Sequence, residues 1–303
     1  MEGLMSVINK KQKGLTRRDF IKGTAAGAVG GSMAGAAGTV LAAVQAEPKP
    51  SQPTKGMPSE AMCAEIVNMR GHQDDAINAY LARPTGSGPY PGVVVVHHMP
   101  GWDEATKEIT RKLAYHGYAS ISPNLHFREG KETPEANSAS VRNAGGMPDN
   151  RTMGDVEGAI RYLRTLSYLN GKVGIIGYCS GGRQVYLAAC TLKGIDAAIA
   201  CYPGGVGAGK EGLTPRQPVD PIDYTKDLNC PLLGFFGRED KRPSPEHMAK
   251  IEAELKKWKK TYELNAYDNA GHSFFAVDRA DYRPVAAVDG WKKVFQWFEK
   301  YLH

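Results

Sequence analysis

The sequence predicts an α/β fold in which a mostly parallel sheet carries helices on both faces. Short apolar or β-branched runs alternate along the chain with helical patterns. Parallel neighbouring strands need crossover connections, and the intervening helices supply them. Residues 93–96 read Val-Val-Val-Val, a continuous apolar run typical of a strand buried on both faces. With 303 residues, 42% of them hydrophobic, the chain is long enough for one large domain.

The first strands along the chain are expected to form a hairpin, and the later ones to follow the βα alternation. Residues 65–69 and 76–82 alternate between polar and apolar side chains, as half-buried strands do. The other runs are short, apolar and bounded by Gly, Pro or polar residues. These further strands are expected at 92–98, 118–122, 172–178, 197–202, 231–237 and 261–267.

Helical periodicity lies between these strands. The expected helices are 104–116, 153–167, 181–192, 245–260 and 284–301, the first and last with charged residues on one face. Residues 128–150 and 204–227 lie outside the alternation, and the second contains a Gly-Gly-Val-Gly-Ala-Gly run. Both are longer than ordinary connections, which is typical of loops that are functional or mobile.

The amino-terminal residues 1–46 resemble a twin-arginine export signal. Arg17 and Arg18 precede a Gly/Ala-rich, mildly apolar stretch, and small residues surround an expected cleavage after Ala46. Lys22 and the many glycines argue against a stable membrane span; the alternative is a short amphipathic or disordered tail. We expect the export machinery as a partner and a periplasmic or secreted location.

Residues 47–61 are rich in Pro, Ser and Lys and are expected to link the signal to a folded domain at 62–303. The formal charge of +6 resides mainly in the signal, because residues 1–46 hold six of the 38 Lys/Arg and two of the 32 Asp/Glu. The remaining 32 basic and 30 acidic residues nearly cancel. This balance gives no indication of a nucleic-acid partner.

The candidate nucleophile is Cys179. Residues 173–182 read Val-Gly-Ile-Ile-Gly-Tyr-Cys-Ser-Gly-Gly, a buried strand followed by Gly177-x-Cys179-x-Gly181 and a helical pattern. Glycines at these positions permit the sharp strand-to-helix turn that exposes a nucleophile. The alternative, a small core side chain, applies better to Cys190 and Cys201, which lack this setting. The five cysteines include no CxxC pair, so the sequence does not support a zinc ribbon or a thiol redox protein.

A thiol needs a base, because a free cysteine of pKa about 8.5 is only slightly ionised at neutral pH. His272 follows the expected strand 261–267 and would lie over the carboxyl edge of the sheet. Asp240 follows strand 231–237 and is the acid expected to orient the imidazole, with Glu239 as the competitor. Cysteine, aspartate and histidine in this order have the chain order of α/β-hydrolase triads.

Two backbone N–H groups are expected to form the oxyanion hole. One belongs to Ser180, directly after the nucleophile, and the other to Met99, in the loop that follows strand 92–98. Only their amides are required for this role.

These residues resemble the dienelactone hydrolases, over roughly 64–302. The densest matches are the segments 154–162 (GDVEGAIRY), 170–174 (NGKVG) and 177–182 (GYCSGG). The resemblance implies an α/β-hydrolase fold and cleavage of a lactone or ester, including one that bears a carboxylate, through a thioester at Cys179. It also implies two substrate-binding arginines. Arg128 matches the first, whereas Ala276 occupies the second position, with Arg279 or Arg283 a few residues later. The alternative for each arginine is a surface ion pair.

One position departs from the family, which has a glutamate near the nucleophile where this chain has His98. A carboxylate disfavours a neighbouring thiolate, whereas an imidazolium favours it, so His98 is expected to tune the Cys179 thiol. His97, His98 and His126 could instead bind a metal, but no ligand spacing supports this, and neither a metal nor a cofactor is expected. The missing glutamate also leaves open a non-catalytic binding protein on the same scaffold.

Overall fold

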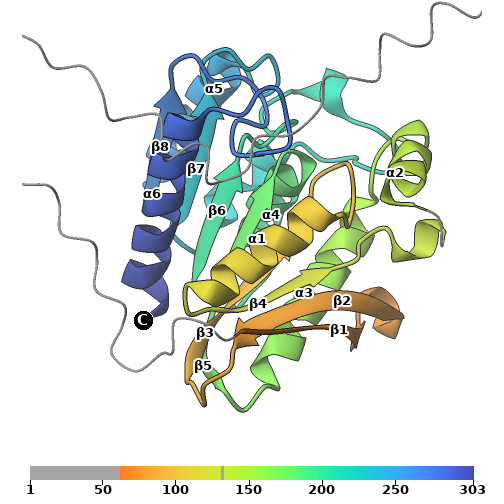
Figure 1. Ribbon diagram of the computed structural model, residues 1–303. Helices are drawn as coiled ribbons and strands as arrows, with labels where there is room; N and C mark the ends of the chain where they lie inside the picture. Colours follow the sequence, from red (N-terminus) through yellow and green to blue (C-terminus); the bar gives the residue numbers. More distant parts are fainter. Residues whose placement is uncertain (1–61, 131–132) are drawn as a thin grey trace, which may run out of the picture. The chain divides into compact units, whose positions relative to one another are not determined.

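An eight-stranded sheet is the centre of the computed structural model, which describes residues 62–130 and 133–303 (Figure 1). The strands are β1 (Met62–Arg70), β2 (Ala76–Pro84), β3 (Tyr90–Val96), β4 (Ala119–Pro123), β5 (Leu169–Tyr178), β6 (Ala197–Cys201), β7 (Leu232–Gly237) and β8 (Tyr262–Tyr267). Their order is β1-β2-β4-β3-β5-β6-β7-β8. Strands β1 and β2 pair antiparallel with each other, β2 pairs antiparallel with β4, and all other pairs are parallel. The predicted α/β-hydrolase fold is confirmed.

Helices cover both faces of this sheet. They are α1 (Glu104–Tyr115), α2 (Pro134–Asn143), α3 (Asp149–Arg164), α4 (Ser180–Thr191), α5 (Pro245–Lys257) and α6 (Pro284–Leu302). Alternate residues of β3 divide between two apolar cores, because successive strand side chains point to opposite faces. Val94 and Val96 pack with residues of α3, α4 and α5, whereas Val93 and Val95 pack with residues of α1 and α6. In Figure 1, α1 crosses in front of the central strands.

The two long connections contain short helices that the sequence pattern did not reveal. Helix α2 lies in the first, and α3 begins four residues earlier than predicted, at Asp149. Thr133 caps α2 by accepting a hydrogen bond from the N–H of Ala136, and Pro134 occupies its first turn. Only Ser138 and Val141 of α2 are buried, so no apolar stripe marked the helix. The second connection contains 3₁₀ turns at Lys210–Gly212 and Pro221–Asp227.

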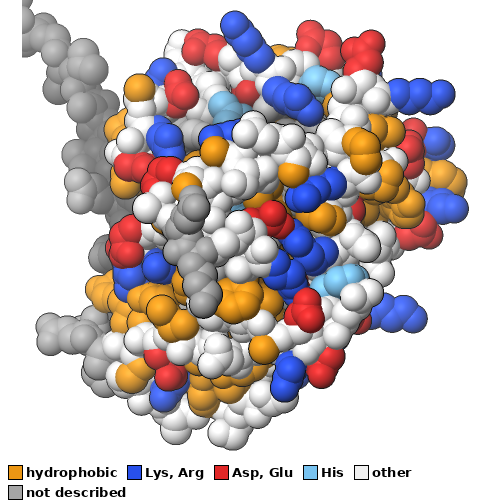
Figure 2. All heavy atoms as spheres, turned by 90° about the vertical axis from the view of Figure 1, so that its right-hand side faces the viewer, with side chains coloured by type: hydrophobic (Ala, Val, Ile, Leu, Met, Phe, Trp, Pro, Cys, Tyr) orange, Lys and Arg blue, Asp and Glu red, His pale blue; other side chains and the backbone are white. Residues whose placement is uncertain are grey.

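The predicted export signal, 1–46, and the linker, 47–61, lie outside the described residues and stay predictions. Within 62–130 and 133–303, no helix has the length and apolar character to cross a bilayer. Figure 2 shows acidic and basic side chains interspersed on one face of the molecule, in keeping with the nearly balanced charge of the domain.

Candidate active site

Cys179 stands on a sharp turn between β5 and α4. Its backbone has φ 56° and ψ −121°, a left-handed conformation that a side-chain-bearing residue adopts only under strain. A Cβ atom on Gly177 would lie 2.5 Å from the carbonyl oxygen of Gly181, and one on Gly181 would lie 2.3 Å from that of Val96. Only glycine fits at these two places, which explains the Gly-x-Cys-x-Gly spacing.

His272 and Asp240 form the second part of the site. The Nδ1 atom of His272 lies 2.7 Å from Oδ2 of Asp240, whose carboxylate is buried. The other carboxylate oxygen, Oδ1, accepts the backbone N–H of Arg242 at 2.8 Å. Glu239, the competing acid, is exposed. With Nδ1 bound to Asp240, the imidazole presents Nε2 to the thiol, the orientation that a triad base requires.

The thiol and the imidazole stabilise each other's charged forms. Burial raises the pKa of Cys179, but the hydrogen bond and the positive charge of His272 lower it, and the net pKa lies below the ordinary value. Burial lowers the pKa of His272, whereas Asp240 and the Cys179 thiol raise it, to about 10. Both directions favour the thiolate–imidazolium form of the pair, the form in which a thiol is an activated nucleophile.

Two backbone amides converge on the same sulfur. The N–H groups of Ser180 and Met99 hydrogen-bond to it and lower the pKa of Cys179 further. The structure thus brings together Cys179, Ser180 and Met99, as the elbow spacing predicts. Because the two N–H groups point toward the sulfur, they are also placed to donate hydrogen bonds to an oxyanion that develops on a carbonyl attacked by that sulfur.

Sequence reasoning missed two supporting side chains. Ser138 of α2 donates a hydrogen bond from Oγ to the carbonyl oxygen of Met99 at 2.7 Å and so braces the oxyanion loop. Tyr202 follows β6 and places its ring 4.9 Å from the ring of His272, centroid to centroid. The position of Tyr202 at the carboxyl end of a central strand was the available signal. Ser138 had none, because its helix was not predicted.

His98 does not contact the thiol through a hydrogen bond. Its Nε2 lies 2.7 Å from Oδ2 of Asp103, the residue that caps α1. The leading influences on the pKa of Cys179 are burial, His272 and the two amides. The structure therefore shows no hydrogen bond through which His98 could tune the thiol as predicted. His272 has a hydrogen bond with the thiol instead.

The neighbouring histidines are buried and neutral. Burial lowers the pKa of His97 to about 3 and that of His126 to about 4. The His97 ring accepts the N–H of Leu125 at Nε2 and donates from Nδ1 to the carbonyl oxygen of His98. Among the described residues, no group of three or more His, Cys, Asp or Glu could hold a metal ion.

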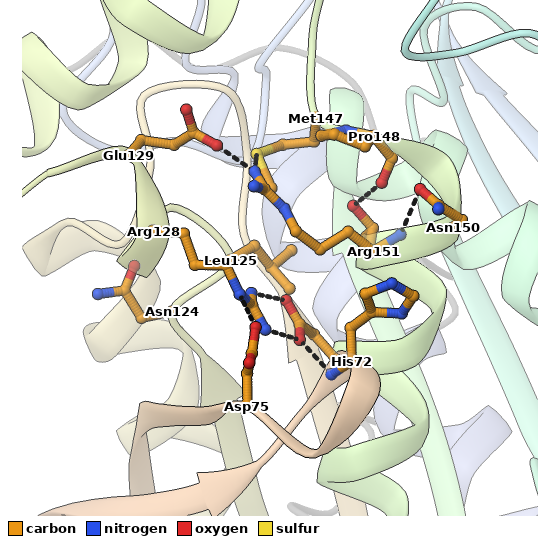
Figure 3. Close-up of polar contacts among 12 residues, drawn as sticks. His72, Asp75, Asn124, Leu125, Arg128, Glu129, Met147, Pro148, Asn150 and Arg151 are labelled. Atoms are coloured by element: carbon orange, nitrogen blue, oxygen red, sulfur yellow. Dashed lines mark hydrogen bonds and ion pairs between the residues drawn. The ribbon is translucent and has the colours of Figure 1, made fainter.

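The guanidinium of Arg128 is bound to two carboxylates (Figure 3). Its guanidinium makes a bidentate pair with Asp155, at 2.8 and 3.0 Å, and reaches Asp75 at 2.8 Å. Asp155 is 0% exposed and also accepts the N–H of His72. The guanidinium of Arg128 is therefore not free to bind a substrate carboxylate at the candidate site. Its contacts agree with the alternative stated for this arginine, an ion pair.

The later arginines also have partners of their own. The guanidinium of Arg279 lies 3.6 Å from the carboxylate of Asp278 at the surface. Arg283 donates from Nε to the carbonyl oxygen of Asn269 at 2.7 Å, which ties α6 to the loop that carries His272. Neither contact identifies a substrate-binding group.

Removal of the imidazole is expected to shift the reactivity of Cys179 to higher pH. In His272→Ala, burial would act on the thiol without its counter-charge, so alkylation by iodoacetamide should require a higher pH than in the parent protein. His98→Ala should leave the profile unchanged. Peptide mass spectrometry would follow Cys179, with the exposed Cys63 as internal reference. An upward shift in His98→Ala would assign the tuning to His98, and an unchanged profile in His272→Ala would contradict the role given to His272.

Comparison with known proteins agrees with this geometry. The family model "Dienelactone hydrolase family" matches residues 77–302. A candidate carboxymethylenebutenolidase of Escherichia coli strain K12 is 33% identical over 251 residues, 80% of this chain and 89% of that protein. A protein of the same name from Methylorubrum extorquens strain AM1 is 31% identical over 262 residues, 86% and 88% of the two chains.

A solved structure of similar shape extends the comparison to three dimensions. The crystal structure of a candidate dienelactone hydrolase from Klebsiella pneumoniae has a TM-score of 0.73 and 29% identity, covering 80% of this chain and all of the other. Fold, sequence and family model thus agree over the part of the chain that carries the elbow and the Asp240–His272 pair, and the chain belongs to the dienelactone hydrolase family.

Proposed function

We propose that this protein hydrolyses carboxylic esters or lactones through a thioester at Cys179. Membership of the family supports a hydrolase. The observation that carries the cysteine mechanism is the environment of one sulfur atom, which stands on a strained turn and receives hydrogen bonds from His272 and two backbone amides. A buried structural cysteine does not need such an environment.

In the first half of the reaction, the Cys179 thiolate attacks the carbonyl carbon and forms a carbon–sulfur bond. The carbonyl oxygen becomes an oxyanion that accepts hydrogen bonds from the N–H groups of Met99 and Ser180. When the tetrahedral intermediate collapses, the carbon–oxygen bond to the alcohol breaks, and the His272 imidazolium protonates the departing oxygen. The thioester remains on the enzyme.

In the second half, water attacks the thioester while His272 takes one of its protons. The carbon–sulfur bond then breaks, the carboxylic acid leaves, and the thiolate is regenerated beside an imidazolium. Asp240 keeps the ring in the required orientation throughout, because its buried carboxylate is held by both His272 and the N–H of Arg242.

Acyl transfer to the sulfur is directly measurable. We expect acid-quenched mixtures of the protein with activated esters to contain a peptide of Cys179 that is heavier by one acyl group. Cys179→Ala should lack the adduct, and exposed Cys63 serves as the control thiol in the same digest. Turnover with no adduct at any quench time, or adducts on Cys63 and Cys179 alike, would contradict the proposal.

A further inference from the structure

A cavity of about 430 Å³ lies between α1 and α6. Its volume falls within the range of about 300–1,000 Å³ that is usual for small-molecule sites. The wall is mainly apolar and aromatic, with side chains contributed by both helices, the carboxyl ends of β3, β5 and β6 and the loop after His272. They include Ile109, Tyr178, Tyr202, Phe275, Val288 and Trp291. We call this space the α1–α6 groove.

The groove begins at residues that adjoin the catalytic groups. Tyr178 immediately precedes Cys179, and His98 immediately precedes Met99, whose amide faces the sulfur. Tyr202 lines the groove and also lies against the ring of His272. The groove therefore adjoins the base through Tyr202, and Cys179 packs against the same apolar cluster that contributes Tyr178 and Phe275 to the wall, which places the groove beside the candidate catalytic groups.

The charged groups along the groove already have partners. Three of the four charged lining residues are carboxylates, of which Glu104 and Glu108 are paired with Arg111 and Asp278 with Arg279. The fourth, Lys112, lies over the ring of Trp291, with Nζ 4.5 Å from the centroid. The arginines that could hold a substrate carboxylate are engaged elsewhere, since Arg128 is paired with Asp155 and Asp75.

We propose that the α1–α6 groove binds an uncharged apolar group, alkyl or aryl, of the ester that Cys179 cleaves. This inference rests on the proposed function and specifies its substrate class: neutral apolar esters or lactones rather than carboxylate-bearing ones. Each methylene that enters the groove should raise kcat/KM by up to about fourfold, the factor that corresponds to burial of one CH₂ group.

Helix α6 offers a matched pair of variants. Val288 and Val285 are both exposed, at 68% and 86%, but only Val288 lines the groove. Two series of esters are used, one with acyl chains of increasing length and one with alcohol chains of increasing length. In at least one of the two series, kcat/KM should rise with chain length. In Val288→Asp, the ratio of kcat/KM for the hexyl ester to kcat/KM for the two-carbon ester of that series should fall about threefold or more. In Val285→Asp, the same ratio should stay at the value of the parent protein. No rise in either series, equal ratios in the two variants, or a preference for ω-carboxylated esters would overturn the assignment.

Binding without turnover separates this inference from the proposed function. In Cys179→Ala protein, neutral alkyl phenyl ketones should quench tryptophan fluorescence with affinity that increases with chain length, and Trp291→Phe should reduce the quenching. Ketone binding together with inactivity of the parent protein toward every ester would overturn the function but keep the groove. Hydrolysis of short esters without ketone binding would overturn the groove alone.

Discussion

Cys179→Ala is expected to lower ester hydrolysis by a factor on the order of 10⁴ or more, as removal of a covalent nucleophile does in related mechanisms. In the proposed mechanism the sulfur forms the thioester, and neither His272 nor the two backbone amides could replace that bond. Measurement of kcat/KM with a chromogenic ester, at enzyme concentrations high enough to detect the residual rate, would give the factor.

Two controls make the result specific to the sulfur. Thermal unfolding of Cys179→Ala should remain close to that of the parent, because alanine keeps a Cβ atom at the strained position where φ is 56°. Cys63→Ala, which changes an exposed cysteine on β1, should keep full activity. Full activity in a folded Cys179→Ala protein would mean that another group performs the chemistry.

Asp155→Asn is expected to lower the free energy of unfolding by about 3 kcal/mol, the scale for removal of one partner of a buried ion pair. Asp155 is fully buried and receives both the guanidinium of Arg128 and the N–H of His72. Without the carboxylate, Arg128 keeps only the half-exposed Asp75, and the connection after β4 loses one of its two ion-pair anchors to α3, the other being Glu129 with Arg151. Urea unfolding followed by circular dichroism would measure the difference.

The matched control is Asp75→Asn, which removes the other carboxylate from the same guanidinium. Asp75 is 56% exposed, so this change should cost less than about 1 kcal/mol, as solvent-exposed ion pairs do. Equal effects of the two substitutions on stability would contradict the anchoring role of the buried pair. A stable Asp155→Asn protein with a specific loss of affinity for carboxylate-bearing esters would show that Arg128 acts on substrate instead of anchoring the loop.

Most of the fold could be predicted because it is encoded in local periodicity. The eight strands and five of the six α-helices correspond to runs with a clear period of two or 3.6 residues or to continuous apolar segments. Helix α2 escaped prediction since it buries only Ser138 and Val141, too few residues to produce a pattern. Its capping threonine and first-turn proline were readable in the sequence, but by themselves such signals are common in loops as well.

The order and spacing of Cys179, Asp240 and His272 were predictable for a geometrical reason. Each follows a parallel strand, and the carboxyl ends of parallel strands meet at one edge of the sheet, so the side chains had to come together. The choice between Glu239 and Asp240 needed coordinates, because adjacent residues in a turn point in different directions. In the structure, Asp240 is buried against His272 and Glu239 faces solvent.

The sheet, the glycine-flanked turn at Cys179 and the edge at which the candidate catalytic groups gather could be predicted from the chain alone, because each depends on backbone geometry within a short segment. The carboxylates that Arg128 and His98 bind, and the place where an apolar groove opens, depend instead on how distant segments pack. Long or polar side chains pair with whatever charge the packing of distant segments brings within reach, as Asp155 is brought to Arg128 from 27 positions away. A cavity likewise exists only once two helices, here α1 and α6, are set at a particular separation across a sheet.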